Sequence, residues 1–175
     1  MTEEAGPRIR GERRRATDAE ARALASAVRL RILRLCSAEA LTNKELAQRL
    51  GRNPATVLHH VRTLADTGFL AAQPPRRGTR GSREVPYLAT GKSWLMDLDD
   101  RPPPARDPLL AAFLEEVSAV GEQRLSSSRL GLRLAPADLQ EFRDRLHGLL
   151  DEFARRPQDP AAEPWSLYLG MHPEA

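Results

Sequence analysis

The chain of 175 residues is long enough to bury a hydrophobic core, and it holds either one domain or a small domain with an appendage. A hydrophobic content of 41% excludes a disordered tail, and no apolar run approaches the roughly 20 residues that cross a bilayer. The net charge of +3 is unevenly distributed, because residues 1–100 carry 18 basic and 12 acidic side chains whereas residues 101–175 carry 9 and 12. This asymmetry suggests that a polyanion binds the first half.

Residues 1–17 contain two glycines, a proline and almost nothing apolar, which predicts a flexible basic arm. The arm either lies along DNA phosphates or is a solvated tail without a role. Its five arginines are Arg8, Arg10, Arg13, Arg14 and Arg15. No apolar segment follows them, so we expect no signal peptide, a cytoplasmic location and no membrane partner.

A helical pattern begins at Asp18, which we expect to be the N-cap. The apolar residues that follow recur at spacings of four, four and three, as in one continuous helix. They are Leu24, Val28, Ile32 and Leu35. The lone cysteine, Cys36, ends this run and is predicted to be a buried structural thiol.

Two further helices are predicted from their N-terminal signals. Residues 41–50 form the second helix, in which Thr42 and Glu45 make a T-x-x-E capping box. The third helix has Asn53 as its N-cap and Pro54 at its first position, where the missing N–H costs nothing.

A β-hairpin is predicted after the third helix, which Gly68 ends. Two extended runs, 69–73 and 83–89, flank a loop rich in glycine and arginine at residues 74–82. Pro86 has no N–H to donate to a neighbouring strand, so we expect the second run at an edge of its sheet.

The segment 41–70 carries the constellation of a helix-turn-helix. Such a motif needs a small residue where the helices cross, a glycine in the turn and an apolar residue between the helices. Ala47, Gly51 and Val57 meet these needs. The residues expected to face the core are Leu46 and Leu50 from the first helix and Val57, Val61 and Leu64 from the second.

The outer face of the third helix, 54–67, is then predicted to read the major groove of double-stranded DNA. Thr56 and His59 are the candidates for base edges, whereas Arg62 lies farther along and meets a phosphate. His60 is expected to be half-buried with a structural role. The full set of predicted DNA contacts from this motif is Arg52, Asn53, Ala55, Thr56, Leu58, His59, Arg62 and Thr63, with Ala55 and Leu58 against a thymine methyl and Arg52 reaching either bases or phosphates.

The loop 74–83 is predicted to be a DNA-binding wing, because a flexible loop bearing cations follows the backbone or enters a narrow minor groove. The alternative is a solvated loop whose charges only aid solubility. Its predicted contacts are Arg76, Arg77, Arg80 and Arg83.

Residues from about 20 to 95 resemble the winged helix-turn-helix regulators of the ArsR-like superfamily. The resemblance is carried by T-V-L-H-H-V-R-T-L-A-D-T-G-F-L at 56–70 and V-P-Y-L-A-T at 85–90. The runs R-L-A-P-A-D-L-Q-E-F and W-S-L-Y-L-G-M-H-P are less specifically similar to the C-terminal regions of actinobacterial members.

The resemblance implies a homodimer that binds a pseudo-palindromic operator, usually as a repressor released by a signal. A small-molecule effector of unknown identity is a further partner that it allows, with a pocket between the C-terminal helices and the winged domain. Metal-sensing members carry a Cys-x-Cys pair on the first helix of the motif, where this chain has Glu45-Leu46-Ala47-Gln48. We therefore expect no metal and no cofactor.

The predicted fold is mainly α with a small β-hairpin wing: a winged helix-turn-helix at 18–98, a Pro-rich linker at 99–108 and a helical region at 109–175. One helix of the last region carries an apolar stripe of period 3.5, which is either intramolecular core or a dimer seam. The segment 165–171 is expected to be a strand or an extended packing segment. The stripe consists of Leu139, Phe142, Leu146, Leu149 and Phe153, in a helix that Pro136 opens, and a preceding helix carries Leu110, Leu114, Val117 and Val120.

Two other function classes compete with a DNA-binding regulator. An enzyme is not expected, because the sequence holds no G-x-S-x-G, H-E-x-x-H, P-loop or paired carboxylates on a recognisable scaffold. The alternative is a winged-helix module for protein–protein interaction, but such modules usually lack a basic wing and an exposed polar recognition face.

Overall fold

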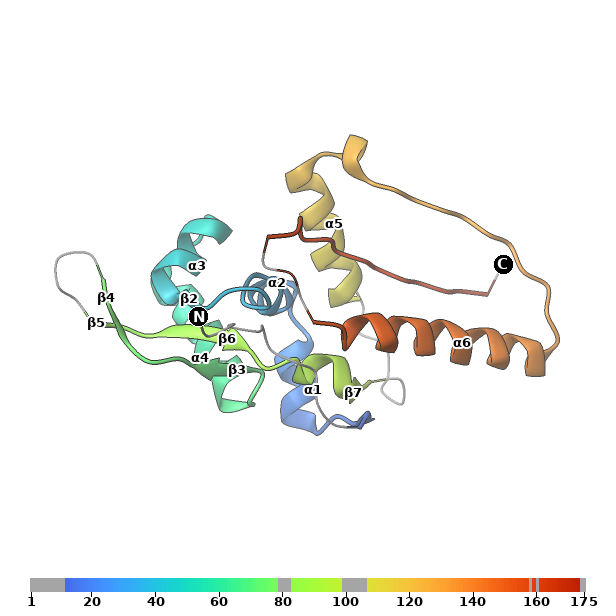
Figure 1. The fold of residues 1–175 in the computed structure, drawn as a ribbon, viewed down its shortest axis with the longest axis horizontal. Coiled ribbons are helices and arrows are strands. Elements are labelled where there is room, and N and C mark those ends of the chain that lie inside the picture. The colour runs from blue at the N-terminus through green and yellow to red at the C-terminus, as the bar shows by residue number, and fades with distance from the viewer. Residues whose placement is uncertain (1–11, 79–82, 99–106, 158, 160, 174–175) are drawn as a thin grey trace.

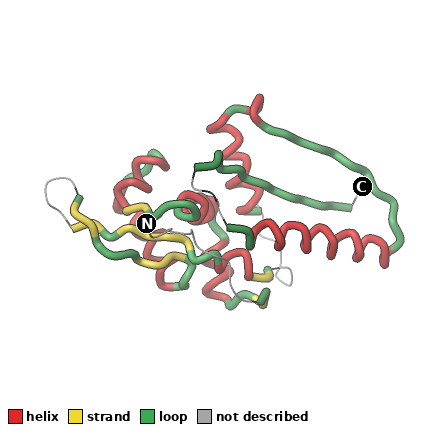
Figure 2. Tube along the Cα trace, in the orientation of Figure 1, coloured by secondary structure: helices red, strands yellow, loops and turns green. Residues whose placement is uncertain are grey.

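The computed structural model describes residues 12–78, 83–98, 107–157, 159 and 161–173. It shows a mainly α fold: short helices with small sheets in the N-terminal half, and longer helices joined by extended segments in the C-terminal half (Figures 1 and 2). The fold class is therefore the predicted one. Most of the basic arm, most of the linker and the tip of the wing lie outside the described residues, but Asp107 caps α5 (Pro108–Val120), so this helix begins inside the predicted linker.

The helix predicted from Asp18 is two helices, α1 (Asp18–Leu24) and α2 (Ala27–Leu35). The predicted N-cap is also wrong, because Thr17 is the N-cap and forms a capping box with Glu20. The apolar spacing fits one helix, but the Arg29 guanidinium donates hydrogen bonds to the carbonyls of Arg22 and Ala23 at the end of α1. These bonds satisfy carbonyls that a helix end leaves without partners, and so they stabilise the break.

The helix-turn-helix consists of α3 (Asn43–Leu50) and α4 (Pro54–Asp66). Both predicted N-terminal signals are confirmed: the capping box at the start of α3, and the Asn53 cap at the start of α4. The helix α3 begins two residues later than predicted, because Leu41–Thr42 forms the short strand β2.

A three-stranded antiparallel sheet has the order β2, β6 (Pro86–Ala89), β3 (Leu70–Ala72). The edge position predicted from Pro86 is therefore wrong, because β6 is the central strand. Pro86 is the first residue of β6 and takes part through its carbonyl, which accepts a hydrogen bond from the Gln73 amide at 2.8 Å. Beyond this sheet, β4 (Arg76–Arg77) and β5 (Arg83–Glu84) continue the predicted hairpin as the wing.

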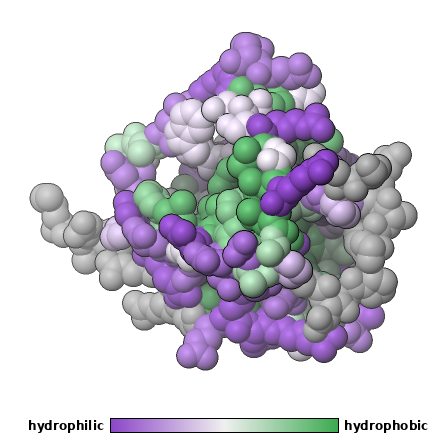
Figure 3. Space-filling view, turned by 90° about the vertical axis from the view of Figure 1, so that its right-hand side faces the viewer, coloured by the Kyte–Doolittle hydropathy of each residue, from purple (hydrophilic) through white to green (hydrophobic). Residues whose placement is uncertain are grey.

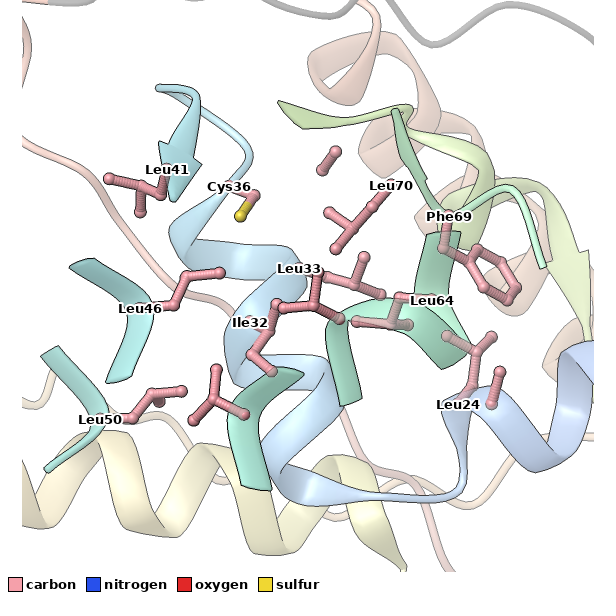
Figure 4. Close-up of a cluster of buried hydrophobic side chains, with 14 of the residues drawn as sticks. Leu24, Ile32, Leu33, Cys36, Leu41, Leu46, Leu50, Leu64, Phe69 and Leu70 are labelled. Atoms are coloured by element: carbon pink, nitrogen blue, oxygen red, sulfur yellow. The ribbon is translucent and has the colours of Figure 1, made fainter. Parts of the chain in front are cut away.

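The core lies between α2, α3, α4 and the sheet, where Ile32 of α2 packs with Leu46 of α3 and Leu64 of α4 (Figure 4). These three side chains are fully buried. Cys36 is buried in the same cluster, and burial raises the pKa of its thiol to about 12. The prediction of a buried structural thiol is confirmed.

Glu20 joins three parts of the chain although it is a buried carboxylate, with only 8% of its side chain exposed. Its carboxylate forms one ion pair with Arg14, at 2.6 Å, and another with Lys92, at 2.7 Å. Arg14 lies in β1 (Arg14–Arg15), which pairs in parallel with β7 (Met96–Asp97), and Lys92 begins the short helix η2 (Lys92–Leu95). The last residues of the predicted flexible arm are thus part of the fold.

The C-terminal half consists of α5, η3 (Glu122–Arg124) and α6 (Pro136–Ala154). Two ion pairs join α5 to α2: Arg31 with Glu115 at 3.1 Å and Arg34 with Glu116 at 3.0 Å. The helix α6 has no buried residue, so its apolar stripe is not intramolecular core in the part of the chain that is described. Among the described helices, none has the length and apolar character needed to span a membrane.

The segment 165–171 is extended without forming a strand, and only Tyr168 of it is partly buried, so most of the predicted packing is not seen. Its Ser166 hydroxyl donates to Glu116, and its Tyr168 ring stacks on Phe113 of α5 with centroids 5.5 Å apart.

We expect Glu20→Gln to lower the free energy of unfolding by about 2 kcal/mol, because the amide leaves two cations without their buried partner. Arg14 first, with Lys92 and Thr17, holds the pKa of Glu20 well below its ordinary value of 4.5. This contribution to stability is present above that value and is lost as the pH falls below it. Urea unfolding at about pH 7 and about pH 3 measures both effects, with the variant less sensitive to acid than the wild type.

Glu39→Gln is the matched control, because Glu39 also pairs with an arginine, Arg49 at 2.6 Å, but keeps 55% of its side chain exposed. Its expected change is below about 0.5 kcal/mol. Equal effects of the two substitutions would contradict the role assigned to Glu20.

Candidate nucleic-acid interface

One side of α4 is committed to the core, and this determines what the other side presents. Val57, Val61 and Leu64 are fully buried, as predicted. On the remaining surface, Ala55, Thr56, His59 and Arg62 are exposed, whereas Leu58 and Thr63 are partly buried. The Thr63 hydroxyl donates to the His59 carbonyl at 3.0 Å.

The start of α4 is organised by the turn before it. Gly51 has φ of +61°, the left-handed conformation that favours glycine, and Arg52 follows it with an exposed side chain. The Asn53 side-chain oxygen accepts a hydrogen bond from the Ala55 amide at 2.8 Å. The side-chain oxygen of Asn53 therefore caps α4, and the side-chain nitrogen of Asn53 is left for a ligand. Amides at the start of a helix of this length also favour a phosphate.

The wing places two cations opposite each other. In the antiparallel pair of β4 and β5, Arg77 is the register partner of Arg83, and both are exposed. Like charges directly opposite each other across two strands are destabilising, and a bound polyanion relieves that repulsion. Arg80, a predicted contact, lies outside the described residues.

Arg76 has a partner that the sequence analysis does not foresee. Its guanidinium binds both carboxylate oxygens of Glu45, each at 2.6 Å. The same carboxylate caps α3, accepting from the backbone amide of Thr42 at 2.8 Å. These hydrogen bonds, that from the Thr42 amide first, lower the pKa of Glu45. A single acidic side chain therefore fixes the base of the wing to the start of α3.

The start of α4 is fixed to the same end of α3. The Asn43 side-chain amide donates a hydrogen bond to the Pro54 carbonyl at 2.9 Å. Asn43 and Glu45 both lie in the first turn of α3, so the first turn of α4 and the base of the wing are each bonded to this end of α3.

His60 is half-buried, as predicted, and its Nδ1 is enclosed without a hydrogen-bond partner among the described residues. Burial and then the charge of Arg29 lower its pKa, so His60 is neutral near pH 7. Its ring is tilted against that of His59 with centroids 5.8 Å apart. Within the described ranges, no group of three His, Cys, Asp or Glu side chains is placed to hold a metal ion.

An open hollow lies between α2 and α5, in the region where the sequence analysis places an effector pocket. Arg31 and Glu115 face each other across it in an ion pair. The effector itself stays a prediction. The lining residues are Arg31, Ala111, Leu114, Glu115, Ser118 and Ala119.

Sequence reasoning missed Asn43 and the second role of Glu45. Asn43 follows an N-cap threonine, where asparagine has no special signal, and its partner lies eleven residues away. Glu45 is recognisable as half of a capping box, but nothing in that pattern points to an arginine 31 residues later.

Residues 24–72 match a family model described as a helix-turn-helix domain. The chain therefore carries a helix-turn-helix domain. The matched segment runs from the last residue of α1 to the end of β3 and includes all of α3 and α4. A comparison with curated proteins found no match.

Several solved structures are similar at low identity. The homodimeric winged helix-turn-helix DNA-binding domain of a possible ArsR-family regulator from Mycobacterium bovis is 22% identical, with a TM-score of 0.36 over 64% of this chain and 83% of that one. The adhesin competence repressor AdcR from Streptococcus pyogenes is 19% identical, with a TM-score of 0.35 over 73% and 79%. ZitR from Lactococcus lactis in complex with DNA is 19% identical, with a TM-score of 0.34 over 73% and 74%.

We expect Gly51→Ala to lower the free energy of unfolding by about 1 kcal/mol, because a side chain disfavours its left-handed φ. No atom lies within 4 Å of the added Cβ, so the cost is that of the backbone alone. Thermal unfolding measures it.

Gly148→Ala is the control, since its Cβ also meets nothing within 4 Å but Gly148 lies inside α6. Here alanine favours the helix by about 0.5–1 kcal/mol. The argument from backbone conformation fails if the two substitutions change stability in the same direction.

Proposed function

We propose that the chain is a DNA-binding transcriptional regulator of the ArsR-like type, which acts as a homodimer on a two-fold symmetric operator. The observation that carries the proposal is that the first turn of α4, whose outer face is exposed, and the base of the basic wing are both bonded to the first turn of α3. Both belong to, or directly follow, the segment that matches a helix-turn-helix domain. A recognition helix inserts its N-terminal turns deepest into the major groove.

In this proposal Thr56 and His59 hydrogen-bond to base edges, because they are exposed and lie in the first two turns of α4. Ala55 and the exposed part of Leu58 contact a thymine methyl group. Arg62, one turn farther along, binds a phosphate. The border of this surface contributes contacts to the DNA backbone, through Arg52, Asn53 and Thr63.

The wing contributes cations to the backbone or the minor groove. Arg77 and Arg83 are directed to phosphates, and Arg80 at the tip belongs to the same set. Arg76 reaches DNA only by leaving or sharing Glu45, so its first role is to hold the wing against α3. The ion pair thus gives Arg76 a different role from the other three arginines of the wing, whereas the sequence analysis predicts DNA contacts for all four.

A two-fold symmetric operator requires two copies of the reading unit, and a bound dimer that covers a promoter acts as a repressor. A small-molecule effector would act by changing the relation of the two copies. A winged-helix module for protein partners is the competing function, and it predicts that no DNA sequence is preferred.

In-vitro selection from a random duplex library at roughly 0.15 M salt tests this proposal. We expect a two-fold symmetric site with half-sites about one helical turn apart. Thr56→Ala and His59→Ala should each relax the preference at particular base pairs, by about 1–3 kcal/mol per lost contact. Recovery of no sequence above background would favour the protein-binding module, and a uniform loss across sequences would remove both residues from base reading.

For the wing, we expect Arg77→Ala with Arg83→Ala to reduce the slope of log affinity against log salt by about 4 for the bound dimer, because each protomer loses two phosphate contacts and each contact releases roughly one counterion. Fluorescence anisotropy over a salt series measures the slope. Arg129→Ala is the control, since Arg129 is exposed in the C-terminal half, far along the chain from the motif. An unchanged slope in the double variant would show that the wing does not touch DNA.

A further inference from the structure

The large apolar side chains that are exposed are confined to one half of the molecule. Those of the described chain with high exposure all lie within residues 109–171, and none lies in the winged helix-turn-helix. Figure 3 looks onto the C-terminal half and shows apolar surface at the centre of this face, ringed by hydrophilic residues. Contiguous apolar surface of this kind marks a contact with another molecule.

Four of the five residues of the α6 stripe, all but Leu139, are arranged symmetrically along the helix. Phe142, Leu146, Leu149 and Phe153 follow one another at spacings of four, three and four, so the order is symmetric about the point between residues 147 and 148. Leu149 and Phe153 are 51% and 53% exposed, and Phe142 and Leu146 are partly exposed. Three of these residues, Phe142, Leu146 and Leu149, line an open groove along the helix.

The charges beside the stripe are also arranged symmetrically, with opposite signs. At 100° per residue, Arg145 and Glu152 lie seven residues apart on the same flank of the stripe. Arg145 lines the groove beside Leu146 and Leu149. When the helix is reversed about the point between residues 147 and 148, Arg145 of one copy lies at the level of residue 150 of the other. It is then within two residues of Glu152 along the axis and on the same flank. An antiparallel copy therefore meets opposite charges on this flank.

The opposite face of α6 is already in use. The Trp94 indole N–H donates to the Asp151 carboxylate at 2.9 Å, and Asp151 lies about 170° around the helix from the stripe. This bond joins the last turns of α6 to η2 of the winged half. The stripe consequently faces away from the winged domain.

We propose that α6 pairs with α6 of a second copy of this chain, antiparallel, about a two-fold axis that passes between His147 and Gly148. In this register Leu146 packs against Leu149 of the second copy, and Phe142 against Phe153 of the second copy. Arg145 forms an ion pair with Glu152 of the second copy, and symmetry makes the pair twice. Glu152 also binds Arg156 of its own chain, but a carboxylate has two oxygens and accepts both.

The occupant is a second copy because both the apolar order and the flanking charges are self-complementary under one operation, which an unrelated partner does not require. This inference rests on the proposed function, because the α6 pairing supplies the dimer that a symmetric operator needs. Through the bond between Asp151 and Trp94, the axis also sets how the two winged domains face each other.

Charge reversal and its restoration test the pairing. We expect Arg145→Glu and Glu152→Arg each to raise the dimer dissociation constant of the full chain at least about tenfold, because each places like charges opposite each other twice. The double variant R145E/E152R should return to within about threefold of the wild type. Residues seven apart on a helix are separated by about 10 Å, so the restoration requires contacts between two chains. Sedimentation velocity over a concentration series measures the constants.

Asp144→Arg is the matched control, because Asp144 lies on the far side of the same helix, where it binds Gln140. It should leave the dissociation constant unchanged. Circular dichroism checks folding, which these substitutions should preserve since α6 has no buried residue. Single variants that dimerise like the wild type, a double variant as weak as the single ones, or a monomeric wild type would each overturn the proposal.

DNA binding is measured separately on the same proteins. A wild type that selects a DNA site but does not respond to the charge changes would overturn the α6 pairing and leave the proposed function intact. A dimer that responds as expected but selects no DNA would support the pairing and overturn the proposed function.

Discussion

The burial of Val57, Val61 and Leu64 determines most of what the N-terminal half presents to its surroundings. These three side chains fix the rotation of α4 about its axis, because turning the helix would expose apolar area and bury polar groups. Once the rotation is fixed, the exposure of Thr56, His59 and Arg62 follows without any further interaction. The exposed face of α4 is thus a consequence of core packing, and this explains why a small hydrophobic cluster suffices to define it.

The position of the wing depends on a different kind of contact. Its strands β4 and β5 are two residues each and bury nothing, so apolar packing does not hold them. The ion pair between Arg76 and Glu45 provides the link instead, and it is partly exposed on both sides. Exposed pairs are weak and are screened by salt, which leaves the wing able to adjust to a groove. In the proposed function, the firmly positioned helix reads base edges and the adaptable hairpin binds the DNA backbone.

Elements with a local chemical signal were predictable from the sequence. The caps at Thr42 and Asn53 and the buried face of α4 depend on residues within one or two turns of one another. The central position of β6 was missed because β2 is two residues long and carries no period. The break between α1 and α2 was missed because it depends on Arg29, whose bonds to distant carbonyls leave no trace in apolar spacing. At the site, the exposed face was predictable, but the contacts of Asn43 and Glu45 with later segments were not.

The two halves of the chain differ in how completely they bury themselves, and this difference has a physical consequence. The N-terminal half closes its core around Phe69, Ile32 and Leu64. Within the described part of the chain no residue of α6 is fully buried, and the exposed part of its stripe costs free energy in water. A helix of this kind gains most of its stability from whatever covers the stripe, since isolated helices are marginal. In the proposed dimer, the folding of α6 is therefore coupled to its pairing with a second copy. The hydrogen bond between Trp94 and Asp151 connects this helix to the winged domain. If α6 pairs as proposed, a ligand that favours one arrangement of this helix changes the spacing of the two copies of α4 without touching either of them.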